Sequence, residues 1–180
     1  MKYCIFVERI FDDKCFNALK RFCISQHELI ITSNGITIEK HPGKIKLFCL
    51  TPANYDLIRA EQGYTGTKEE LSKIMAKRYK ELESIGFNIE LHLHLGLRLE
   101  NLNQKKIFEE ALLWMWKNSF DIGYWTAGWY IYNNESINIA ERNGIEYFKD
   151  NKHYSFHDYE YDKIFDPMMI ITNIRGLLRF

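Results

Sequence analysis

Two histidines, His92 and His94, lie two residues apart in the apolar segment 88–95, and their spacing is the first feature that could do chemistry. Residues i and i+2 of a β-strand point to the same face, so both imidazoles would share one face while the alternating leucines share the other. Neutral imidazoles at this spacing can ligate one cation when a neighbouring strand supplies a carboxylate. The alternative interpretation is an amphipathic strand whose polar face is hydrated and has no function.

Two adjacent aspartates, Asp12 and Asp13, follow the first apolar segment of the chain. Adjacent side chains point in different directions, so one aspartate could bind a metal while the other stays free as a base. A bound metal would also lower the pKa of its water toward about 7. Taken alone, however, the pair favours a helix N-cap followed by a first-turn carboxylate.

A third candidate is the aromatic segment 123–132, which contains Trp125, Trp129 and Tyr130 around two glycines. Flat aromatic rings suit the C–H faces of sugars, so these three side chains are candidates for substrate binding. Large aromatic residues also fill protein cores, and the sequence leaves both uses open.

The segment 153–162 is the fourth candidate, with His153 and His157 one helical turn apart and Asp158 and Asp162 after them. It could supply a proton donor or further metal ligands. Because it has no apolar periodicity, the pattern favours a solvated polar loop.

The elements that must position these residues alternate along the chain. A capping-box pattern at Thr67–Glu70 and a glycine at position 86 delimit the clearest helix. Asn34-Gly35 predicts a hairpin inserted at about 28–40. Strands are expected at 2–8, 44–52, 88–95, 145–148 and 168–172, helices at 11–22, 67–85, 103–117 and 134–142, and a strand that becomes an aromatic loop at 119–130. This alternation predicts an α/β protein with mostly parallel strands, whose active site would lie at their carboxyl ends.

Composition narrows the class of protein. The 180 residues, of which 46% are hydrophobic, predict a single domain over 1–180. Lys plus Arg and Asp plus Glu both number 24, which argues against a nucleic-acid partner. No apolar run has the length of a membrane span or a signal-peptide core, so we expect a cytoplasmic protein without a membrane partner. The four cysteines lack C-x-x-C spacing and are expected to be buried thiols.

The order of these motifs resembles the polysaccharide deacetylase, or NodB-homology, family. The resemblance covers about residues 3–150 and extends to a late histidine motif. The segments that carry it are "IFDDK" (10–14), "KIKLFCLTP" (44–52), "IGFNIELHLHLG" (85–96), "TAGWYIYNNESINIAERNGIEY" (126–147) and "FHD" (156–158).

The resemblance implies a deformed (β/α) barrel that binds a divalent metal, commonly zinc, and hydrolyses an acetamide on a carbohydrate or small molecule. It implies that Asp12 is the general base and His157 the general acid. It also implies that Asp13, His92 and His94 are the metal ligands.

Two alternatives stay open. The chain has Lys14 where the family has glycine, H-x-H where it usually has H-x-x-x-H, and no Arg or Pro in "TAGWY", which favours a non-catalytic binding module on the same scaffold. The H-x-H spacing also resembles that of amidohydrolases and of the polymerase-and-histidinol-phosphatase domain. Those families place this motif on their first strand, so this resemblance ranks second.

Overall fold

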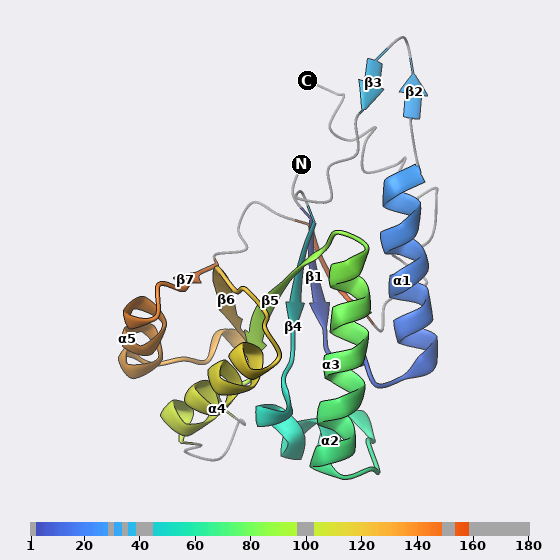
Figure 1. Cartoon of the computed structure of the whole chain (residues 1–180). Coiled ribbons are helices and arrows are strands. Elements are labelled where there is room, and N and C mark those ends of the chain that lie inside the picture. The colour runs from blue at the N-terminus through green and yellow to red at the C-terminus, as the bar shows by residue number, and fades with distance from the viewer. Residues whose placement is uncertain are drawn as a thin grey trace.

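The fold is built on one parallel β-sheet (Figure 1). The computed structural model describes residues 3–28, 31–33, 36–38, 45–96, 103–148 and 154–158. The six-stranded sheet has the order β7-β6-β5-β4-β1-β8, and every neighbouring pair in it is parallel. Its strands are β1 (Tyr3–Val7), β4 (Ile45–Cys49), β5 (Asn88–Leu93), β6 (Tyr124–Ala127), β7 (Glu146–Tyr147) and β8 (Tyr154–His157).

At least one helix lies between each of the successive sheet strands from β1 to β7, which confirms the predicted α/β class with parallel strands. Helices α1 and α3 pack against each other beside β1 and β4, α4 packs against α5 nearer β6 and β7, and all four helices contribute to one core against the same face of the sheet (Figure 1). The helices are α1 (Asp13–Glu28), α2 (Tyr55–Gln62), α3 (Lys68–Ser84), α4 (Gln104–Lys117) and α5 (Asn134–Arg142), with short 3-10 turns η2 (Pro52–Asn54) and η3 (Gly128–Tyr130). Strands β2 (Ile31–Ser33) and β3 (Ile36–Ile38) pair with each other in antiparallel fashion, within the segment where a hairpin insertion is predicted.

The helix ends follow the chemistry expected from the sequence. Thr67 and Glu70 form both hydrogen bonds of a capping box at the start of α3. After its last turn the chain reverses at Gly86, whose φ of 94° lies in the left-handed region that glycine adopts without steric penalty. Asn103 and Asn133 each cap a following helix by accepting a backbone N–H.

The two faces of the sheet are packed differently. Alternate residues such as Ile5 and Val7 join the main core beneath the helices. Cys4, with Phe6 packed beside it, belongs to a second cluster that also contains Phe48 and Phe148. Because side chains alternate along a strand, Glu8, two positions after Phe6, lies on this second face just beyond the carboxyl end of β1.

An ion pair between the buried Glu90 and the partly buried Lys46 links three strands at the amino-terminal end of this second face. Glu90 accepts hydrogen bonds from the backbone N–H groups of Gly123 and Tyr124, at 3.0 and 2.8 Å, and from Lys46 Nζ at 2.9 Å. We expect Glu90→Ala to lower the free energy of unfolding by about 1.5–3 kcal/mol, because it removes the shared acceptor of a partly buried ammonium group and of two partly buried backbone N–H groups. Urea unfolding measures this loss.

The matched control for that prediction is Glu109→Ala on the surface of α4. Glu109 lies 4.0 Å from Lys105, and both side chains are half exposed. Water screens such a pair, so the change in unfolding free energy should stay within about 0.5 kcal/mol. A loss of similar size in both variants would contradict the structural role of Glu90.

Two segments near the carboxyl end differ from expectation or lie outside the described chain. The segment 153–162 is predicted to be a polar loop, but residues 154–157 form β8, which pairs in parallel with β1. The predicted strand at 168–172 lies outside the described residues. The prediction of buried cysteines is confirmed, since all four lie in the interior. Among the described residues no helix is long and apolar enough to cross a membrane.

Candidate metal centre

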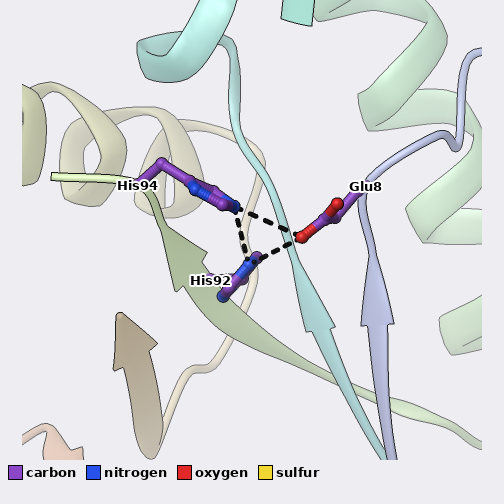
Figure 2. A group of neighbouring side chains, drawn as sticks. All are labelled: Glu8, His92 and His94. Carbon is purple, nitrogen blue, oxygen red and sulfur yellow. Dashed lines mark hydrogen bonds and ion pairs between the residues drawn. The ribbon is translucent and has the colours of Figure 1, made fainter. Parts of the chain in front are cut away.

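Three side chains converge at the carboxyl end of the sheet: Glu8, His92 and His94 (Figure 2). The Nε2 atoms of both imidazoles lie 3.2 Å from Glu8 Oε1 and 3.2 Å from each other. All three residues are buried. Among the described residues, this is the group of ligand-type side chains compact enough to hold one metal ion.

Strand register explains why these residues meet. Val7 pairs with Cys49 on β4, and Cys49 pairs with Leu91 on β5, so these three lie at one level across the sheet. The residues that follow Val7 and Leu91 are Glu8 and His92, which therefore reach the next level together on the opposite face. His94 follows two residues later on the same face. The prediction that the two histidines share one face of the strand is therefore confirmed.

Aromatic rings line the floor and one side of this site. The ring of Phe6 has its centre 5.0 Å from that of His92 and 5.2 Å from that of His157. Trp129 meets the ring of His94 edge-on at 4.4 Å. Gly128 lies so close to His94 that a Cβ at this position would be 2.4 Å from two of its ring atoms. These contacts fix the imidazole planes before any ligand arrives.

The backbone of Glu8 is held by a buried carboxylate from β8's end. Asp158 Oδ1 accepts the N–H of Glu8 at 3.1 Å, and its Oδ2 accepts the N–H of Arg9 at 2.7 Å. Burial raises the pKa of Asp158 to about 7, against the opposing effect of these two N–H donors. The turn after β1 is thereby anchored to the neighbouring strand.

The electrostatics favour an ionised Glu8 carboxylate beside a neutral His92 imidazole. Burial acts to raise the pKa of Glu8, but the adjacent imidazoles of His157, His92 and His94 outweigh it and hold that pKa well below its usual range. Burial lowers the pKa of His92 to about 4, against the opposing effect of Glu8. At neutral pH, protons therefore do not compete for these two ligand atoms.

This donor set fits a divalent metal. Two imidazole nitrogens and one carboxylate oxygen are the ligands of catalytic zinc sites, which keep a further position open. The residues also line a cavity of about 540 Å³, so such a position would face the cavity rather than packed protein. In both histidines, Nε2 is the ring nitrogen that faces Glu8 Oε1. The Nδ1 atoms are buried and have no hydrogen-bond partner in the described part of the chain.

The predicted aspartates lie elsewhere. The Asp13 side chain is 80% exposed and pairs with Arg78, so the geometry does not support it as a metal ligand. Asp12 Oδ1 accepts the N–H groups of Lys14 and Cys15 at the start of α1, which lower its pKa. Neither aspartate lines the cavity. The physical reason is that β1 ends at Val7, and by residue 12 the chain has already turned into the helix, as the alternative N-cap interpretation expects.

The aromatic candidates separate into two environments. Trp125 is fully buried in the main core, where its ring contacts Phe108 and Tyr147, so the expectation that it binds substrate is not supported. Trp129 and Tyr130 line the cavity and are 43% and 73% exposed. Trp125 lies on the helix-facing side of β6, whereas the other two follow the end of that strand.

His157 lies beside Glu8 at the wall of the same cavity. It is the last residue of β8, pairs in register with Phe6 and lines the same cavity. Its Nδ1 atom is 3.4 Å from Glu8 Oε1, and its side chain is 35% exposed. The structure therefore brings His92, His94 and His157 together around Glu8.

The sequence analysis does not include Glu8 among the candidates, and it includes Asp158 only as part of the polar segment 153–162. A signal for Glu8 was present, because it immediately follows the apolar run and continues the alternation of Cys4 and Phe6. The role of Asp158 in holding the backbone after β1 has no local signal, because its hydrogen-bond partners are 149 and 150 residues away in sequence.

Comparisons of the chain with protein-family models, with curated proteins and with solved structures give no match.

Proposed function

We propose that this chain is a metal-dependent hydrolase that cleaves an amide on a sugar or another small molecule. Glu8, His92 and His94 would hold one divalent cation, most suitably zinc. The observation that carries the proposal is the convergence of these three buried ligands on one point at the wall of a cavity of about 540 Å³.

The strand order supports the deformed barrel that the family resemblance implies. From β1 through β4, β5 and β6 to β7, each strand is added on the same side of the previous one, and β8 returns to pair with β1. A sheet wound in one direction with its last strand beside its first has the order of a (β/α) barrel opened between β7 and β8. The candidate ligands lie at the carboxyl ends of the strands, where barrel enzymes place their active sites.

The side chains around the ligands suit hydrolysis. A bound zinc ion would supply Lewis acidity and acidify water. His157 reaches the cavity wall beside Glu8 and would transfer a proton to the departing amine. Trp129 and Tyr130 offer exposed rings to a sugar or another small molecule. The base that the resemblance assigns to Asp12 is not supported, because that carboxylate caps α1.

One observation favours a second function, a metal-binding module without catalysis. The carboxylate expected to act as the general base is held at the start of a helix and does not line the cavity. Such a module would keep the three ligands and the cavity but would not turn over an amide.

Metal removal and reloading tests the proposal. We expect the purified protein to bind one equivalent of zinc or cobalt, and free metal at 100 times its dissociation constant to stabilise the fold by about 2.7 kcal/mol. Chelation should reverse the gain in thermal stability. Absence of bound metal together with unchanged stability after chelation would overturn the proposal. Bound metal without hydrolysis of N-acetylated sugars or simple acetamides would support the binding module instead.

A further inference from the structure

We infer that Asn54 is a positioning residue of the metal centre. Its side-chain amide makes the hydrogen bonds to the His94 backbone that an adjacent strand would otherwise make. The inference rests on the proposed metal function, since it assigns the group that holds one of the three ligands in place.

The need for such a group follows from where the sheet stops. The last β5 residue paired with β4 is Leu91, and the last one paired with β6 is Leu93. His94 therefore lies beyond both ladders, although it is buried. A buried backbone N–H or C=O without a partner is strongly destabilising, so both groups of His94 require one from outside the sheet.

Asn54 satisfies both groups at once. Its Nδ2 donates to the carbonyl oxygen of His94 at 2.7 Å, and its Oδ1 accepts the N–H of His94 at 3.3 Å. Both hydrogen bonds are buried, and Asn54 is only 4% exposed. A primary amide presents a donor and an acceptor side by side, the same pair of groups that an adjacent strand would present.

Asn54 is itself fixed by the short turn η2 at the end of β4. Its backbone N–H donates to the Thr51 carbonyl at 3.0 Å, and Thr51 Oγ1 accepts the N–H of Ala53 at 3.3 Å. Pro52 restricts the backbone at the first position of the turn. The amide therefore extends from a rigid, locally capped element, which makes it suitable for holding a neighbouring backbone.

Two cavities adjoin His94, so the Asn54 hydrogen bonds contribute much of what holds its backbone in place. His94 lines the cavity of about 540 Å³ and also a second cavity of about 260 Å³, which Asn54 helps to form. A residue between two cavities has fewer packed neighbours to resist displacement. Without the amide, the His94 backbone would be free to shift and to carry its Nε2 away from Glu8 Oε1, now 3.2 Å distant.

The test compares Asn54→Ala and Asn54→Asp with a matched control, Asn143→Ala. Asn143 also donates Nδ2 to a backbone carbonyl, that of Ile139 at 2.7 Å, but in a partly buried position at the end of α5. Asn54→Ala removes both hydrogen bonds to His94. Asn54→Asp keeps an acceptor for the His94 N–H but places a carboxylate oxygen against its carbonyl, so it is the second variant if alanine prevents folding.

The measurement is a titration of each metal-free full-length protein with Co²⁺, followed by visible absorption, with unfolding curves showing that each variant is folded. We expect both Asn54 variants to bind Co²⁺ about 10- to 100-fold more weakly and to give an altered absorption band, because the ligand geometry changes. Asn143→Ala should match the wild type in both respects, whatever its stability.

Two results would overturn the inference. If the wild type binds Co²⁺ and the folded Asn54 variants bind it equally well with the same band, then Asn54 does not position the ligand and the proposed metal function stands. If the wild type itself gives no band and no binding, the proposed metal function fails and the inference fails with it.

Discussion

Glu8→Gln is expected to weaken zinc binding by at least about 100-fold while the protein stays folded. Glutamine keeps the size of the side chain but removes the negative charge that a buried cation requires, and an amide oxygen is a poor ligand for zinc. Glu8 contributes the carboxylate of the group, at 3.2 Å from both imidazole Nε2 atoms. Competition with a chromophoric chelator measures the dissociation constant.

The control for this prediction is Asp13→Asn, which also removes one carboxylate from the amino-terminal part of the chain. The Asp13 side chain is 80% exposed and paired with Arg78, so we expect zinc affinity to stay within about twofold of the wild type. The reverse outcome, in which Asp13→Asn loses zinc and Glu8→Gln keeps it, would return the ligand role to the aspartate that the family resemblance assigns.

Gly128→Ala should weaken metal binding by about 10- to 100-fold, although it adds a single methyl group. The new Cβ would lie 2.4 Å from Cε1 and Nδ1 of His94 and 2.6 Å from its Nε2, so the ring must move. Any rotation or shift of the ring displaces Nε2 from the point it shares with Glu8 and His92, and metal sites tolerate little displacement. The same titration as for Glu8→Gln gives the affinity.

Gly123→Ala is the matched control for the steric effect. An added Cβ at Gly123 meets nothing within 4 Å, so metal affinity should not change. Wild-type affinity in Gly128→Ala would mean that His94 does not need its present ring position, and the assignment of His94 as a ligand would then be wrong.

Much of the fold is local in origin and was therefore readable from the sequence. The capping box at Thr67–Glu70 begins α3 where the pattern predicts, and α5 spans the predicted residues Asn134–Arg142. The period-two alternation around His92 and His94 predicted their shared face, and the structure brings their Nε2 atoms within 3.2 Å of each other. These features depend on contacts between residues close in the chain.

The identity of the carboxylate was harder to predict, because two aspartates are more conspicuous than one glutamate. The choice depended on where β1 ends, and sequence patterns locate element ends least well. Because β1 ends at Val7, the next residue, Glu8, lies at the site. The hydrogen bond from Asp12 N to Arg9 O shows that the chain has turned away from the sheet before it reaches the aspartates.

Non-local pairing explains the remaining differences. Residues 154–157 read as a polar loop, but as β8 they lie beside β1, which supplies backbone partners that no local pattern reveals. Trp125 and Trp129 are only four residues apart, yet one is in the core and the other on the cavity wall. The strand ends between them, and the positive φ of 54° at Trp129 turns the chain.

Anomalous diffraction from crystals of the zinc-loaded protein tests the central claim most directly. We expect one strong peak at the zinc edge, about 2.0–2.2 Å from a Glu8 carboxylate oxygen and from Nε2 of both His92 and His94. A zinc peak beside Asp13, or fully loaded crystals with no peak between these three side chains, would contradict it.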